Sequence, residues 1–140
     1  MSTARDIMTP DVTCVRSDES VVDAARKMVE LDVGALPVRG PDERLRGMLT
    51  DRDIVVRVVA EGRDPAACTA GELVRGELVT VGADDPLQRV LELMADRRIR
   101  RVPVIDGHAL VGIIAQADVA RRLPDSTVGD LVADVSRPPA

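Results

Sequence analysis

The sequence matches itself when it is shifted by 66 residues. Such an internal repeat means that one structural unit occurs twice, and it constrains the fold more than any local motif does. A unit of about 60 residues buries too little apolar surface to be stable alone, so the two copies are expected to pack together. The aligned pairs are Thr3-Ala4 with Thr69-Ala70, Met28 with Met94, Pro37-Val38 with Pro103-Val104 and, after a one-residue shortening, Gly47 to Asp53 with Gly112 to Asp118.

Each copy predicts the element order β-α-β-β-α, and therefore an α/β fold of the α+β type. Short β-rich runs alternate with one amphipathic stripe at the helical i, i+3, i+4 spacing. An acidic pair before each stripe is expected to cap the helix with an Asp side chain. In the first copy we expect strands at 12–15, 35–38 and 45–50, a helix on the stripe Val21, Ala24, Ala25, Met28 and Val29 after Asp18-Glu19, and a helix at 51–61 that Gly62 ends. In the second we expect strands at 78–81, 102–105 and 110–114, a helix on Leu87, Val90, Leu91, Met94 and Ala95 after Asp84-Asp85, and a helix at 116–123 before Pro124.

These elements divide the chain into a first repeat (1–62), a linker (63–68), a second repeat with a C-terminal helix (69–135) and a frayed tail (136–140). Residues 128–132 echo 70–74 and suggest a third copy of the helix that leads each repeat.

Composition excludes several functions. The chain lacks Trp, Tyr and Phe, so it cannot hold nucleobases by aromatic stacking, and its formal net charge of −5 disfavours nucleic acid as a partner. No apolar run approaches the roughly 20 residues that span a bilayer, and the N-terminus has no apolar signal segment, so we expect a cytoplasmic protein without a membrane partner. Two cysteines and one histidine at unrelated spacings favour neither a disulfide framework nor a metal site.

The order of elements and the duplicated motifs resemble a tandem pair of CBS (cystathionine β-synthase) domains, which forms a Bateman module with a pseudo-twofold axis. The resemblance rests on Gly34 to Val38, on Arg100 to Val104 and on the two Gly-h-h-x-x-x-Asp segments, where h is apolar. The opening Ala4 to Pro10 and the run Gly47 to Val55 also resemble small free-standing actinobacterial CBS proteins of the hypoxic-response type.

The resemblance implies two clefts between the repeats, each able to take an adenosine-type ligand such as AMP, ADP, ATP, NAD or S-adenosylmethionine. At a strand-to-helix junction, free helix amides favour a phosphate and a carboxylate can accept both ribose hydroxyls. Asp53 in a first helical turn would equally stabilise that helix by about 0.3 to 1 kcal/mol. Carried over from the family, the first cleft combines Thr50 and Asp53 with Val79, Thr80, Val81 and Val102, and the second combines Asp118 with Thr13, Cys14, Val15 and Leu36.

The two clefts are not equivalent in sequence. Ala115 stands where the first repeat has the Thr50 hydroxyl, so the first cleft is expected to bind more tightly. Arg100 and Arg101 stand where the family often places phosphate-binding cations, although they could equally belong to a solvated charge run with Arg97 and Arg98. Most of the cleft valines could equally be ordinary core.

No catalytic constellation is evident, and we do not expect an enzyme. His108 is expected in a surface turn, Cys14 as a small buried apolar residue without a neighbouring cation, and Cys68 in the linker, where a thiol can be exposed. We therefore predict a regulatory nucleotide-sensing module that requires no cofactor. The alternative is a stress-response or hypoxia-response interaction protein whose clefts no longer bind nucleotide. Ile54, Val55, Val58 and Val59 offer more apolar surface than one contact stripe needs, which predicts a homodimer; an unidentified protein effector is the other expected partner.

Overall fold

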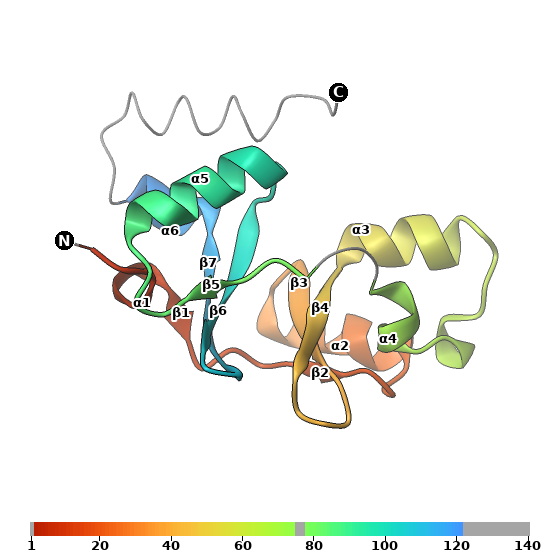
Figure 1. Cartoon of the computed structure of the whole chain (residues 1–140). Coiled ribbons are helices and arrows are strands. Elements are labelled where there is room, and N and C mark those ends of the chain that lie inside the picture. The colour runs from red at the N-terminus through yellow and green to blue at the C-terminus, as the bar shows by residue number, and fades with distance from the viewer. Residues whose placement is uncertain (1, 75–77, 122–140) are drawn as a thin grey trace. The chain divides into compact units, whose positions relative to one another are not determined.

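The computed structural model describes residues 2–74 and 78–121. The chain forms two compact units, which are described separately below (Figure 1). The central unit is Thr13–Leu78, and the terminal unit combines Met1–Val12 with Val79–Ala140. The expected ends of the last helix (122–123), the third leading helix (128–132) and the tail (136–140) lie outside the described residues.

The central unit contains a three-stranded sheet of order β2-β3-β4, in which β2 runs parallel to β3 and β4 runs antiparallel to it. Val38 pairs with Val15 on one side and with Gly47 on the other. The elements are β2 (Val15–Arg16), α2 (Val21–Leu31), β3 (Ala35–Arg39), β4 (Leu45–Thr50), α3 (Asp51–Ile54), the π-helix η1 (Val55–Val59), the 3-10 helix η2 (Pro65–Ala67) and α4 (Ala70–Leu73).

The terminal unit contains a four-stranded sheet of order β1-β7-β6-β5. β5 runs parallel to β6, and β6 and β7 form an antiparallel hairpin whose other edge is covered by β1. The elements are α1 (Ala4–Ile7), β1 (Thr9–Pro10), β5 (Val81–Gly82), α5 (Leu87–Arg97), β6 (Arg101–Asp106), β7 (Ala109–Ala115) and α6 (Gln116–Ala120).

The mixed α/β fold with two β-α-β-β-α repeats is confirmed. The first strand of each repeat is shorter than predicted and begins three residues further along the chain, at Val15 instead of residue 12 and at Val81 instead of residue 78. These valines are the first residues of their strands to pair with a neighbouring strand. The first helix of each repeat begins after Ser20 and Pro86, so the prediction of an Asp cap is wrong. Ser20 Oγ accepts the Asp23 amide at 3.1 Å.

The acidic residues before these helices stabilise the preceding turn instead. Asp85 Oδ2 accepts the amide of Gly82 at 2.8 Å, and Glu19 Oε1 accepts the amide of Arg16 at 3.3 Å. Both carboxylates therefore hold the end of the first strand rather than the start of the helix.

The leading helix of each repeat packs in the unit formed by the other repeat. The Ala4 amide donates to the Asp85 carbonyl at 2.9 Å, and the equivalent Ala70 amide donates to the Glu19 carbonyl at 2.8 Å. Ala4 and Ala70 are both fully buried, each in a different apolar core. The sequence repeat and the compact unit are therefore different divisions of the chain.

This exchange explains the glycine that begins each Gly-h-h-x-x-x-Asp motif. A Cβ on Gly47 would lie 2.5 Å from Val74 Cγ1, and a Cβ on Gly112 would lie 2.5 Å from Met8 Sδ. Val74 and Met8 are the residues that follow the exchanged helices α4 and α1. Each motif glycine thus makes room for the chain that leaves the exchanged helix.

Burial corrects three expectations in the central unit. Val29 belongs to the predicted core stripe but is 82% exposed, and Val58 belongs to the predicted dimer surface but is fully buried. The segment predicted as a linker contains η2, and Cys68 beside it is buried in the central core, where its carbonyl accepts the Val21 amide at 2.9 Å. Cys68 is therefore not an exposed thiol.

Candidate nucleotide-binding junctions

Thr50 and Asp53 lie where β4 passes into α3, and they cap each other. Thr50 Oγ1 accepts the Asp53 amide at 3.1 Å, and Asp53 Oδ2 accepts the Thr50 amide at 2.9 Å. Thr50 still has a hydroxyl proton to donate, and Asp53 Oδ1 makes no hydrogen bond to another described residue. The reciprocal cap shows that both side chains stabilise the helix start, and it leaves one donor and one carboxylate oxygen for a ligand.

The equivalent junction of the terminal unit has half of this cap. Asp118 Oδ2 accepts the Ala115 amide at 2.7 Å, but Ala115 has no side-chain acceptor for the Asp118 amide. The Asp118 side chain is only 12% exposed, and its Oδ1 lies 3.7 Å from Arg121 Nη1. Both repeats therefore hold an aspartate at the equivalent strand-to-helix junction, but only Asp53 has a side-chain hydroxyl beside it.

The expectation of free amides at the start of α3 is wrong. The Asp51 amide donates to the Gly34 carbonyl at 3.0 Å, the Arg52 amide donates to Asp51 Oδ1 at 2.8 Å, and the Asp53 amide is capped by Thr50. Asp51 and Asp53 also make this first turn acidic. A phosphate at this junction would have to be held by side chains rather than by helix amides.

Arg100 and Arg101 lie beside the Asp118 junction. The Arg100 carbonyl accepts the Gln116 amide at 2.8 Å, and Arg101 pairs with Ala115 across β6 and β7. Both arginines are exposed, and neither makes an ion pair with another residue that the structure describes. The hydroxyl and the cations are thus divided, with Thr50 at the first junction and the arginine pair at the second.

The side chains expected around the base are of two kinds. Val15, Leu36, Val81 and Val102 are buried in the apolar cores, so a ligand could contact little more than their backbone. Thr13 is exposed, whereas Cys14, Val79 and Thr80 are partly buried. Each predicted cleft draws residues from both units, and that combination stays a prediction.

Cys14 lies among cations, contrary to expectation. Arg39 Nη2 is 3.6 Å from its Sγ, and Lys27 Nζ donates to its carbonyl at 3.4 Å. Burial nevertheless raises the pKa of the Cys14 thiol above its ordinary value, because desolvation outweighs the opposing effect of Arg39. Cys14 is therefore a protonated thiol at neutral pH and not an activated nucleophile.

Glu43 joins the cations beside Cys14. It accepts from Arg16 Nη1 at 3.1 Å and from Arg39 Nη1 at 3.3 Å, and these two hydrogen bonds lower the pKa of its carboxyl. A second pair joins Lys27 to Glu19 at 2.9 Å. The described cations around Cys14 are therefore paired with carboxylates.

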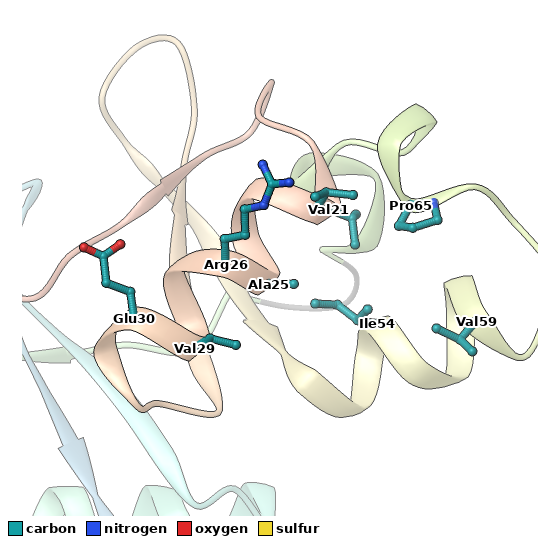
Figure 2. A pocket seen from close by; sticks show the side chains of 9 residues that line it. Val21, Ala25, Arg26, Val29, Glu30, Ile54, Val59 and Pro65 are labelled. Carbon is teal, nitrogen blue, oxygen red and sulfur yellow. The ribbon is translucent and has the colours of Figure 1, made fainter.

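An apolar groove in the central unit was not predicted as a cavity. It holds about 460 Å³ between α2, α3, η1 and η2 and is lined mainly by Val21, Ala25, Val29, Ile54, Val59 and Pro65 (Figure 2). The charged ends of Arg26 and Glu30 extend away from these apolar side chains. Val21, Ala25 and Val29 belong to the one apolar stripe that the sequence predicts for this helix, and the prediction places that whole stripe in the core. Within the described residues, no helix is both long enough and apolar enough to cross a lipid bilayer.

The duplicated fold and its paired aspartate junctions are those of a tandem CBS pair, a Bateman module. The CBS domain profile matches residues 4–60 and 70–125, and the chain belongs to the CBS-domain family of regulatory modules. It is 49% identical over 140 residues to hypoxic response protein 1 of Mycobacterium tuberculosis, an alignment that covers 100% of this chain and 98% of that protein.

Two solved structures are also similar. The crystal structure of Hypoxic Response Protein I with two coordinated zinc ions has a TM-score of 0.80 and 52% identity, covering 88% of this chain and 100% of that one. The crystal structure of CBSX2 in complex with AMP has a TM-score of 0.74 and 26% identity, covering 87% of this chain and 96% of that one.

Zinc does not fit the residues that the structure describes here. They include no group of three or more His, Cys, Asp and Glu side chains that could hold a metal ion. The Cys14 sulfur faces the Arg39 cation, Cys68 is buried in an apolar core, and His108 lies exposed in the turn between β6 and β7.

Proposed function

We propose that the chain is a regulatory module that binds an adenosine-type nucleotide in clefts between its two repeats and catalyses no reaction. The observation that carries the proposal is the aspartate at the same junction of both repeats, whose carboxylate accepts the backbone amide of the residue three positions before it. Asp53 uses Oδ2 for the Thr50 amide and leaves Oδ1 for a ribose hydroxyl. The AMP complex of the structurally similar CBSX2 supports this ligand class.

The rest of the ligand follows from the neighbouring groups. At the Asp53 junction, the Thr50 hydroxyl can donate to a ribose or phosphate oxygen, whereas at the Asp118 junction Arg100 and Arg101 supply guanidinium groups suited to phosphate. The base would lie against aliphatic strands and bond to their backbone, because the chain has no aromatic ring to stack on it. AMP, ADP, ATP, NAD and S-adenosylmethionine share this chemistry.

A second function has a specific observation in its favour. The first-turn amides of α3 are satisfied by protein groups, and Ala115 lacks the hydroxyl of Thr50. Both facts favour a hypoxia-response or stress-response interaction protein whose clefts bind no nucleotide. Under either function we propose a cytoplasmic homodimer that acts on a protein effector.

Calorimetry with the five ligands separates the two functions. Asp53→Asn keeps an oxygen for the Thr50 amide but removes the charge, so it should weaken binding at least about tenfold while the fold is retained. Asp118→Asn is the matched change in the other repeat and should have the smaller effect if the Thr50 cleft binds more tightly. A larger effect of Asp118→Asn would reverse this ranking. Wild-type protein that binds none of the five would support the interaction protein.

A further inference from the structure

The Gln116 side chain carries a buried donor that no protein group satisfies. Its Nε2 atom is shielded from solvent and has no hydrogen-bond partner in the part of the chain that the structure describes, although Gln116 as a whole is partly exposed. A carboxamide nitrogen has two protons to donate, and a buried donor without an acceptor is destabilising compared with one that is bonded. Buried polar groups are otherwise almost always paired, so this atom calls for an acceptor from a bound molecule.

Gln116 is the first residue of α6, and backbone bonds place it next to two cations. Its amide donates to the Arg100 carbonyl at 2.8 Å, and Arg101 pairs with Ala115, the residue before Gln116. Both arginines are exposed, and neither forms an ion pair within residues 2–74 and 78–121. The Gln116 amide is already bonded, so a ligand at this corner would be held by side chains. A carboxamide donor and guanidinium groups together suit the oxygens of a phosphate.

The first repeat has the same backbone arrangement but the opposite charge. The Asp51 amide donates to the Gly34 carbonyl at 3.0 Å, as the Gln116 amide donates to the Arg100 carbonyl. A Cβ on Gly34 would lie 3.2 Å from Asp51 Oδ2, so the Asp51 carboxylate lies directly against this glycine. The equivalent pairs are Asp51 with Gln116, Gly34 with Arg100 and Ala35 with Arg101. At these positions the first repeat has one carboxylate and the second has two guanidinium groups and a neutral amide, so only the second attracts an anion.

We propose that the Gln116 carboxamide donates to a phosphate oxygen of the nucleotide at the Asp118 junction, which makes this cleft selective for phosphorylated adenosine ligands. Arg100 and Arg101 strengthen the selection through their charge. The inference rests on the nucleotide binding proposed above and names the ligand class of one cleft. Adenosine and S-adenosylmethionine carry no phosphate, and the sulfonium of the latter is positive, so this junction disfavours both relative to AMP, ADP, ATP and NAD. Gln116 thereby supplies the side-chain donor that Ala115 lacks.

Calorimetry with adenosine and AMP tests the selection in an Asp53→Asn chain, in which the first junction is weakened and the second is intact. AMP should bind at least about tenfold more tightly than adenosine, because only AMP meets the charged donors. Gln116→Leu removes the carboxamide and should weaken AMP at least about fivefold, whereas adenosine should change less than about twofold. Gln88→Leu, the same substitution at an exposed position of α5, is the matched control and should change neither affinity.

Two further variants separate contact with the ligand from support of the fold. Gln116→Glu keeps the size of the side chain but introduces a carboxylate, as Asp51 does in the first repeat. It should therefore weaken AMP more than Gln116→Leu does and favour S-adenosylmethionine relative to AMP. Arg101→Ala, at an exposed side chain, should weaken AMP and leave adenosine unchanged. In urea unfolding, Gln116→Leu should be at least as stable as its parent chain, because the substitution removes an unbonded buried donor.

The contrary results are distinct. A Gln116→Leu chain that binds AMP with unchanged affinity would refute the contact and assign Nε2 to a water molecule. Equal weakening of AMP and adenosine would show that Gln116 supports the fold of the junction instead of contacting the phosphate. Either result leaves the proposed nucleotide binding standing, whereas a wild-type chain that binds none of the adenosine ligands would overturn both proposals.

Discussion

The two junctions differ by one hydroxyl, and exchanging that hydroxyl should shift stability in opposite directions. Thr50 and Ala115 have nearly the same extended backbone, with φ −111° and ψ 159° for Thr50 and φ −101° and ψ 159° for Ala115. Each precedes a helix whose third residue is an aspartate that accepts its amide. A threonine at position 115 should therefore accept the Asp118 amide as Thr50 accepts the Asp53 amide at 3.1 Å.

The expected size follows from the single hydrogen bond that changes. Exchanging Thr for Ala at a helix N-cap alters stability by about 0.5 to 2 kcal/mol, with about 1 kcal/mol as the usual value. Thr50→Ala should lower the free energy of unfolding by about 1 kcal/mol, and Ala115→Thr should raise it by a similar amount. Ala115 is only partly buried, so the added atoms do not have to enter the core.

Urea unfolding monitored by circular dichroism measures both changes, and hydrogen exchange of amides 116–120 locates the second. Thr50→Ser is the matched control, since it keeps the acceptor oxygen and should stay close to wild type. If Ala115→Thr left the exchange rates in α6 unchanged or destabilised the chain, the equivalence of the two junctions would be refuted.

Three further changes test other parts of the structure. Gly47→Ala should destabilise the chain by about 1 to 3 kcal/mol in urea unfolding, because its Cβ would collide with the segment after α4; a neutral result would contradict the exchanged packing. Val58→Ala should cost about 2 kcal/mol, whereas Val55→Ala, at a side chain 56% exposed, should stay within about 0.5 kcal/mol; equal costs would contradict the inward direction of Val58. Burial raises the pKa of the Cys14 thiol above its ordinary value of 9.0, so the folded state favours the protonated thiol. The stability that Cys14 contributes is therefore complete at pH values below the pKa of the thiol in the unfolded chain. That stability is lost as the pH rises through the pKa of the thiol in the folded chain. Alkylation of Cys14 should accordingly accelerate only in strongly alkaline buffer. Arg39→Ala should move that acceleration to still higher pH, because Arg39 lowers the pKa of the thiol. Rapid alkylation of Cys14 in the wild-type chain at neutral pH would contradict the raised pKa.

The sequence repeat predicted the order of elements because each copy carries its own periodicity and turn residues. The amphipathic helices α2 and α5 and the hairpins β3 with β4 and β6 with β7 are all local features of the chain. The exchange of leading helices is not local. Thr9 and Pro10 pair with β7, more than a hundred residues away, and no periodicity in a short segment identifies such a partner.

The junction residues were predictable in position but not in bonding. The motif places Thr50 and Asp53 at a strand-to-helix boundary, yet only geometry shows that the two cap each other and occupy the first-turn amide. Val29 and Val58 were assigned to the wrong sides for a related reason. The apolar stripe predicted for α2 is broad, so helical spacing alone does not show which of its residues face the core, and η1 departs from the regular helical spacing because it is a π-helix.

The most direct test of the nucleotide-binding proposal is equilibrium dialysis against AMP read at 260 nm. The chain has no Trp, Tyr or Phe, so it contributes almost no absorbance there, and any excess on the protein side is bound nucleotide. The proposal predicts a saturable excess equivalent to at least one AMP per chain, which Asp53→Asn reduces. Equal absorbance on both sides, with AMP and with each of the other adenosine ligands in turn, would contradict it.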